Sequence, residues 1–205
     1  MLFKADEICA WIEGTAAPCD PDDPLCVVPK PNLDELKKSG TASLDLRLGR
    51  WFLMLRQDRT EILEVHRQNS EKLEPYIARR IFVPFGNRFV LHPRSFVLGC
   101  TLEWIRLPSS IGGYVFGKSS WGRRGLVIET APGVHPGFSG CLTLEMSNVG
   151  TVPLAIQPGI RICQIAFQST RGDSAKSEGI HIGMRRPDIS LISSDEVAEK
   201  LSEPL

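Results

Sequence analysis

The sequence predicts a mainly β protein, built as a barrel or a sandwich. Residues 42–49 alternate between apolar and polar side chains, as a half-buried strand does, and residues 141–146 repeat this pattern. From residue 81 to residue 107, short apolar runs are separated by Gly-Asn and His-Pro turns. Many short strands divided by turn residues are typical of all-β barrels and sandwiches.

The chain length fits one domain. A protein of 205 residues can bury a substantial core. We expect a single domain over residues 1–205, with an N-terminal helix and proline-rich arm in 1–40, a barrel core in 41–167, and a mobile tail ending in a short helix in 168–205.

The charge balance is even, because 24 Lys and Arg residues match 24 Asp and Glu residues. No overall field would attract a nucleic acid or a membrane, so an anionic ligand needs a local cluster of cations. No apolar run approaches the roughly 20 residues of a membrane-spanning helix. The first residues lack the layout of a signal peptide. We expect a cytoplasmic protein with neither nucleic-acid nor membrane partners.

The six cysteines form no C-x-x-C pair. Cys141 and Cys163 lie inside apolar strand patterns, which favours buried free thiols over a disulfide framework or a zinc site. Only Cys19 and Cys26, in a loop, are placed to form a disulfide.

The N-terminal region combines a helix with an extended arm. Residues 2–13 fit a short amphipathic helix. Five prolines between residues 15 and 32 exclude a helix and favour an extended surface arm. One helical turn is expected in Asp34–Lys38, ended by Gly40.

The strands of the core follow. They are expected at 42–49, 51–55, 81–84, 89–91, 96–107, 152–156 and 160–167. Residues 56–80 are charged and weakly patterned, which indicates a loop or an insertion. Residues 168–190 are rich in glycine and charge, which favours a mobile tail. Ser193 and Glu196 fit a capping box that begins a last short helix.

Glu145 is a candidate catalytic carboxylate. In residues 141–146 the apolar Leu142, Leu144 and Met146 alternate with polar or small residues, so Glu145 points away from the buried face. Its neighbours on that face are small, which leaves room for a ligand. On this pattern alone, a surface glutamate remains the favoured interpretation.

The turn Gly117–Ser120 is a candidate phosphate site. A Gly-Lys-Ser-Ser turn supplies backbone N–H groups, a cation and hydroxyls, all of which suit phosphate. The turn lacks the spacing of a P-loop and is a weak signal by itself. Arg123 and Arg124 follow it directly, and one of two adjacent arginines is usually a solvated surface charge.

Five linked motifs resemble one known family. They read ASLDLRLG, FVLHPRSFVLGCTLEWIRLP, GKSSWGRRGL, HPGFSGCLTLEMSN and PLAIQPGIRICQIAF. Over residues 42–167 they are similar, in order and in spacing, to bacterial and archaeal dCTP deaminases of the trimeric dUTPase-like superfamily. The resemblance implies a distorted β-barrel and a homotrimer with active sites between subunits.

The resemblance also implies roles for individual residues. Glu145 matches the general base and proton shuttle of the family, while Ser119 and Arg123 match residues that orient water and stabilise charge. The remaining matches are substrate contacts: Lys118, Ser120, Gln164 and Lys176 toward phosphates, Ala131 in the loop that contacts the base, and Val134 with His135 in the turn that meets the sugar. For Gln164, a structural strand-edge amide is an equally good interpretation.

The implied chemistry needs no metal ligand from the protein. The sequence has no H-x-E…P-C-x-x-C signature, which separates it from zinc-dependent cytidine deaminases, and its four histidines are scattered. We therefore expect no zinc and no metal-ligating residues. Mg²⁺ is expected only as the counter-ion of the deoxycytidine triphosphate substrate.

Three positions depart from the family pattern. His135 stands where the family has an aspartate that meets the sugar 3′-hydroxyl. The loop 128–133 is one residue shorter than usual and contains Pro132. The tail keeps Lys176 but lacks the tyrosine that normally accompanies it.

Three functions fit these observations. The first is deamination of dCTP to dUTP and ammonia. The second is a bifunctional enzyme that also releases pyrophosphate and forms dUMP; a plain dUTP diphosphatase fits less well, because such an enzyme activates water with an aspartate where His135 stands. The third is a catalytically silent, nucleotide-binding regulatory protein.

Overall fold

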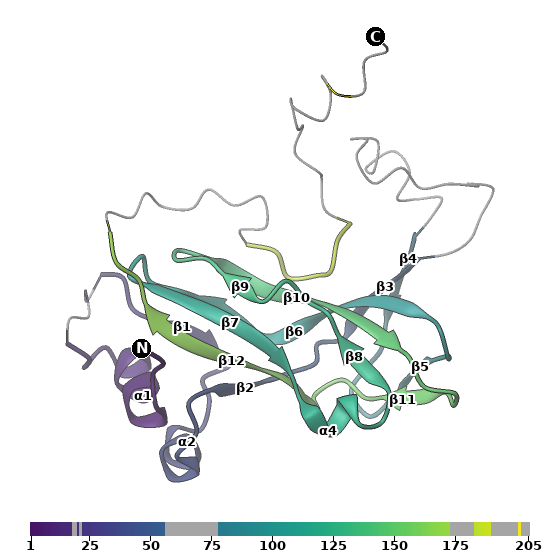
Figure 1. Cartoon of the computed structure of the whole chain (residues 1–205), viewed down its shortest axis with the longest axis horizontal. Coiled ribbons are helices and arrows are strands. Elements are labelled where there is room, and N and C mark those ends of the chain that lie inside the picture. The colour runs from purple at the N-terminus through teal and green to yellow at the C-terminus, as the bar shows by residue number, and fades with distance from the viewer. Residues whose placement is uncertain (18–19, 21, 56–77, 173–182, 190–200, 202–205) are drawn as a thin grey trace.

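The computed structural model describes residues 1–17, 20, 22–55, 78–172, 183–189 and 201. Strands dominate this part of the chain, and two helices lie side by side near its N-terminus (Figure 1). The predicted mainly β fold class is confirmed. The predicted final helix, Lys176 and Cys19 lie outside the described residues, and a single domain stays a prediction.

The N-terminal helix is present as predicted but starts later. Helix α1 spans Ala5–Glu13 and ends at Gly14, whose φ of 71° is a left-handed conformation that glycine adopts without strain. It buries Ile8 and Trp11 among its apolar residues. Leu2 lies outside the helix and forms an isolated bridge with Gln168 instead.

The proline-rich arm is only partly a surface arm, so this prediction needs correction. Strand β1, Cys26–Val28, pairs antiparallel with β6, Phe96–Arg106, and buries Val27. The short run between prolines is thus an edge strand that packs on the core. Helix α2, Leu33–Ser39, confirms the expected helical turn, and Asn32 caps it by accepting a hydrogen bond from the backbone N–H of Glu35.

The strands form three sheets. The largest has the order β4-β3-β6-β10-β8, with β1 beside β6. Its further strands are β4 Ala78–Phe82, β3 Trp51–Leu55, β10 Ser139–Asn148 and β8 Leu126–Ile128. A four-stranded sheet has the order β2-β12-β7-β9, made of Leu44–Arg47, Arg161–Ser169, Ile111–Gly117 and Gly133–Val134. Strands β5, Phe89–Leu91, and β11, Leu154–Ile156, form the third.

The pairings among the described residues do not close these sheets into one barrel. The six- and four-stranded sheets are linked by an isolated bridge between Leu48 and Thr101. The strands β7, β8 and β9 had no counterpart in the sequence prediction. The expected β-barrel is therefore distorted in the sense that its sheets stay open.

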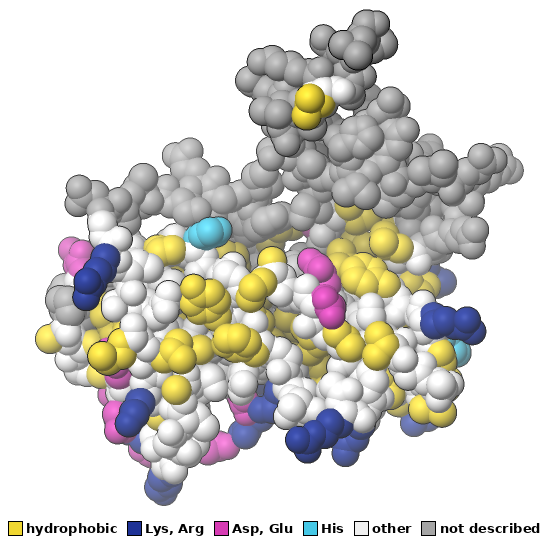
Figure 2. Space-filling model, viewed as in Figure 1, with side chains coloured by type: hydrophobic (Ala, Val, Ile, Leu, Met, Phe, Trp, Pro, Cys, Tyr) yellow, Lys and Arg dark blue, Asp and Glu magenta, His cyan; other side chains and the backbone are white. Residues whose placement is uncertain are grey.

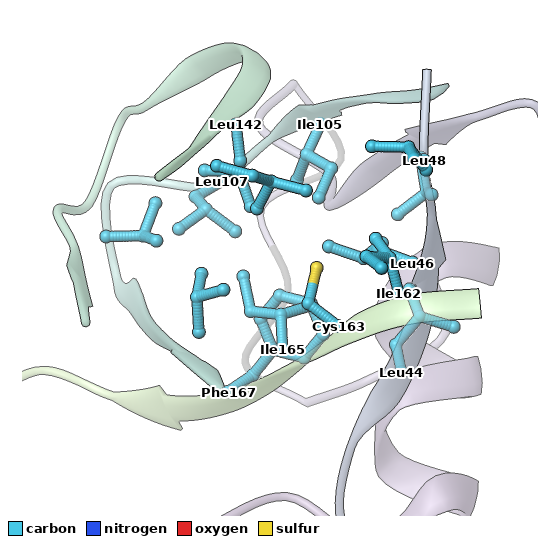
Figure 3. Close-up of a cluster of buried hydrophobic side chains, with 14 of the residues drawn as sticks. Leu44, Leu46, Leu48, Ile105, Leu107, Leu142, Ile162, Cys163, Ile165 and Phe167 are labelled. Atoms are coloured by element: carbon cyan, nitrogen blue, oxygen red, sulfur yellow. The ribbon is translucent and has the colours of Figure 1, made fainter. Parts of the chain in front are cut away.

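A shared apolar core holds the sheets together. Figure 3 shows side chains from β2, β6, β10 and β12 converging on one another. Leu46, Ile162 and Phe167 are fully buried there. Each side chain of this kind stabilises the fold by about 1.5–3 kcal/mol when buried. This rigid centre fixes the strands whose polar faces carry the candidate site.

Residues 183–189 lie across the outer face of the six-stranded sheet. The backbone N–H of Cys141 donates to the carbonyl of Met184 at 2.8 Å, and the guanidinium of Arg186 lies 4.3 Å from the centre of the Trp51 ring. This part of the C-terminal region is therefore anchored on β10 and β3. None of the described helices is long and apolar enough to cross a membrane.

Candidate functional site

The four-stranded sheet aligns three residues from separate motifs. Gln164 on β12 lies opposite Asp45 on β2 and opposite Phe116 on β7. Residues directly opposite each other in an antiparallel ladder project from the same face. That face is the outer one, because Leu44 and Leu46 beside Asp45 are buried in the core.

Lys118 joins this row at the end of β7. Its Nζ atom lies 2.5 Å from Oδ1 of Asp45, and Ser43 donates a hydrogen bond to Gln164 at 3.3 Å. Lys118, Asp45, Ser43 and Gln164 line one pocket of about 320 Å³. The structure therefore brings together two of the predicted phosphate contacts, Lys118 and Gln164.

Among the charged residues of this pocket, the sequence prediction named only Lys118 and missed the others, including Arg161 and Glu35. Arg161, at the start of β12, lies 2.5 Å from Glu35 of α2 and 3.8 Å from Oδ2 of Asp45. The carboxylate of Glu35 raises the pKa of Arg161 by hydrogen bonding and by its charge. The alternation in β2 places Asp45 on a polar face, but no local pattern indicates that α2 folds over that face.

A buried carboxylate lies beneath the pocket. Glu103 on β6 is only 6% exposed and accepts a hydrogen bond from the backbone N–H of Arg47 at 2.8 Å. Burial raises the pKa of Glu103, and the Arg47 hydrogen bond only partly offsets this. The pocket lining thus mixes both charges: its cations are Lys30, Arg47, Lys118 and Arg161, and its anions are Glu35, Asp45 and Glu103.

The Gly-Lys-Ser-Ser turn leads into the short helix α4, Ser119–Gly122. Its Trp121 donates an indole hydrogen bond to the carbonyl of Arg161 at 2.8 Å, so the turn is attached to the strand that carries the second cation. Ser119, Ser120 and Arg123 are exposed. Cations gather around α4 at the lower edge of the molecule in Figure 2.

Glu145 lies on β10, opposite Leu98 of β6. It is half-buried, and its neighbours Leu144 and Met146 are fully buried, which confirms the predicted alternation. The Thr130 hydroxyl accepts a hydrogen bond from the Glu145 backbone N–H at 3.1 Å and thereby ties this part of β10 to the loop after β8.

Within one chain, Glu145 does not contact its predicted partners Ser119 and Arg123. Among the described residues, no hydrogen bond or ion pair joins Glu145 to Ser119 or to Arg123. Strand β8 lies between β10 and α4. Within one chain, the predicted site residues therefore lie in two separate places: around the pocket that contains Lys118, and on the outer face of β10.

The predicted base and sugar contacts lie in one hairpin. Ala131 and His135 are exposed, whereas Val134 is buried in the core, which leaves only its backbone for a ligand. The carbonyl of Pro132 accepts a hydrogen bond from the backbone N–H of Val115 at 2.8 Å and so attaches the shortened loop to β7. No cluster of three His, Cys, Asp or Glu side chains suited to a metal occurs among the residues that the structure describes.

The fold is that of a mainly β protein, and its candidate site is a pocket lined by both cations and carboxylates. A family model described as dCTP deaminase-like matches residues 27–170. The dCTP deaminase of Halorubrum lacusprofundi is 37% identical over 177 residues, which is 83% of this chain and 85% of that protein. The chain belongs to the dCTP deaminase-like family.

Two further comparisons agree with this family. A protein of Sulfurihydrogenibium named "dCTP deaminase, dUMP-forming" is 39% identical over 157 residues, 75% of this chain and 83% of that protein. The crystal structure of 2′-deoxycytidine 5′-triphosphate deaminase from Agrobacterium tumefaciens superposes with a TM-score of 0.59 at 23% identity. That match covers 82% of this chain and 48% of the other, and it shows a shared fold.

Proposed function

We propose that the protein deaminates dCTP hydrolytically, without zinc. The proposal is carried by the convergence on one pocket of Lys118 and Gln164, both expected from the resemblance as phosphate contacts, in a chain of this family. The relatives compared above are named as dCTP deaminases. A triphosphate would bind through Lys118, Ser120 and Gln164, with Mg²⁺ as the counter-ion it brings.

Glu145 is proposed as the proton shuttle. Its carboxylate takes a proton from water as the oxygen attacks C4 of the cytosine ring, and this proton goes to N3. A second proton passes from the added hydroxyl to the amino group, which leaves as ammonia and yields the uracil ring. Arg123 would stabilise the charge that develops during attack, and Ser119 would orient the water.

We propose further that the catalytic set is completed between subunits of a homotrimer. Glu145 and the turn Ser119–Arg123 are half-sites in one chain, so a neighbouring copy would have to supply the missing half. Tyr114 and Phe116 are 39% and 46% exposed on the outer face of β7. A homotrimer would cover such exposed aromatic side chains, and Figure 2 shows apolar side chains gathered on one face of the molecule.

The product is a second question. The Sulfurihydrogenibium relative is named for forming dUMP, so a bifunctional reaction that also cleaves the triphosphate is the alternative. His135 stands where a dUTP diphosphatase uses an aspartate, which favours dUTP as the product. A cytoplasmic location stays a prediction.

One incubation separates these readings. The full chain is mixed with dCTP and Mg²⁺, and the cytosine absorbance, ammonia and pyrophosphate are followed together. We expect ammonia without pyrophosphate; equal release of both would show the dUMP-forming reaction. Saturable binding of dCTP without any turnover would contradict the proposed activity.

A further inference from the structure

Four charged side chains, alternately positive and negative, form a row of ion pairs along the pocket around Lys118. Lys118 contacts Asp45, Asp45 contacts Arg161, and Arg161 contacts Glu35, at 2.5, 3.8 and 2.5 Å. These residues come from β7, β2, β12 and α2. In this arrangement both cations face carboxylates of the protein itself.

The ion pair between Arg161 and Glu35 is the one that a ligand anion can open most easily. The side chains of Arg161 and Glu35 are 45% and 57% exposed, compared with 26% and 29% for Lys118 and Asp45. Exposed ion pairs contribute little to stability, because water screens both partners. A ligand anion can therefore replace Glu35 at low cost.

Arg161 is well suited to such a ligand. A guanidinium offers a planar fork of donors that matches phosphate oxygens, and it keeps its charge at any physiological pH. The Trp121 indole holds the backbone of Arg161 beside the Gly-Lys-Ser-Ser turn. The guanidinium of Arg161 therefore lines the same pocket as Lys118 and Gln164.

Helix α2 does not depend on Glu35 for its position. Its Leu36 is buried in the core, and the carbonyl of Leu33 accepts a hydrogen bond from the thiol of Cys9. A second ion pair, between Lys37 and Glu13, joins α2 to α1 at 3.5 Å. The helix can thus stay in place while the Glu35 carboxylate moves away.

We propose that Arg161 is an additional phosphate-binding residue, and that Glu35 acts as an internal anion that competes with the ligand for it. The inference rests on the proposed function in one respect, namely that the ligand is a nucleotide triphosphate. It follows that removing the charge of Glu35, a residue in the pocket wall, should strengthen the binding of the triphosphate rather than weaken it.

The test measures binding of inorganic triphosphate with Mg²⁺ to the full chain by calorimetry. Glu35→Gln should bind about 2- to 5-fold more tightly than wild type, since the competing exposed pair is lost. Arg161→Gln should bind about 10-fold more weakly, and Arg161→Lys should fall between, because it keeps the charge without the fork. Glu13→Gln is the matched control, because it removes one acid of α1 from its ion pair with Lys37 of α2, outside the pocket.

Unchanged or weaker binding by Glu35→Gln would overturn the inference, as would unchanged binding by Arg161→Gln or no binding by wild type and Glu35→Gln alike. Because the probe has no base and the readout is binding, the result is independent of deamination. A chain that fails to deaminate dCTP but shows tighter binding in Glu35→Gln would refute the proposed function and keep this inference.

Discussion

The Nζ atom of Lys118 lies 2.5 Å from Oδ1 of Asp45, a residue 73 positions earlier in the chain. The contact crosses the sheet, because β2 and β7 do not pair with each other but both pair with β12. It fixes the ammonium group over the pocket. The charge that the proposed function assigns to phosphate binding is thus held in place before any ligand arrives.

Replacing Lys118 by Gln should weaken substrate binding rather than slow the chemical step. A charged hydrogen-bond donor to phosphate is lost, so we expect KM for dCTP to rise about 10-fold while kcat changes by less than about 3-fold. Steady-state kinetics check this. Lys38→Gln, on the exposed face of α2, is the control for the loss of one positive charge. A fall in kcat at unchanged KM would place Lys118 in the chemical step instead.

The two adjacent arginines should differ sharply. Arg123→Gln removes the proposed stabiliser of developing charge, and we expect kcat to fall by about 100-fold or more. The guanidinium of Arg124 lies 5.4 Å from the centre of the Trp121 ring, a surface contact. Arg124→Gln should therefore keep its activity and lose only about 0.5 kcal/mol of stability. Equal loss of activity in both variants would remove the distinct role given to Arg123.

The buried Glu103 should leave a signature in the pH dependence of stability. Burial raises its folded-state pKa above the ordinary value of 4.5, so its ionised form costs stability at neutral pH. That cost disappears as the pH falls through the folded pKa toward the unfolded one. Relative to wild type, Glu103→Gln should gain stability as the pH rises from about 4 to about 8.

Urea unfolding of both proteins across this pH range gives the difference directly. The exposed Glu7→Gln is the control for removing one negative charge. A flat difference between Glu103→Gln and wild type, or a difference of opposite slope, would show that the burial of Glu103 carries no such cost.

Local patterns were sufficient for much of the fold. Alternation of apolar and polar residues placed Glu145 on the outer face of its strand. Helix α2 begins after its cap Asn32 and ends at Gly40, where the sequence indicated a helical turn. Strand β1 was missed because three residues between prolines carry almost no periodicity. It becomes a strand only through pairing with β6, which is a tertiary effect.

The site was less accessible to sequence reasoning. The resemblance predicted Lys118 and Gln164 as phosphate contacts, and both line one pocket, but the contact between Arg161 and Glu35 joins residues 126 positions apart. No local spacing encodes such a pair, because it depends on α2 folding over the outer face of β2 and β12. Bringing Glu145 close to Arg123 requires quaternary structure in the proposed homotrimer, because the two residues would then come from different chains.

The most direct test of the proposed deamination is ammonia release from dCTP by Glu145→Gln. Glu129→Gln is the matched control, since Glu129 is exposed and its backbone N–H donates to the carbonyl of Glu145. We predict that Glu145→Gln loses at least about 1,000-fold in rate and still binds dCTP, with a melting temperature within about 3 °C of wild type, whereas Glu129→Gln keeps its activity. Ammonia release by Glu145→Gln at the wild-type rate would contradict the account.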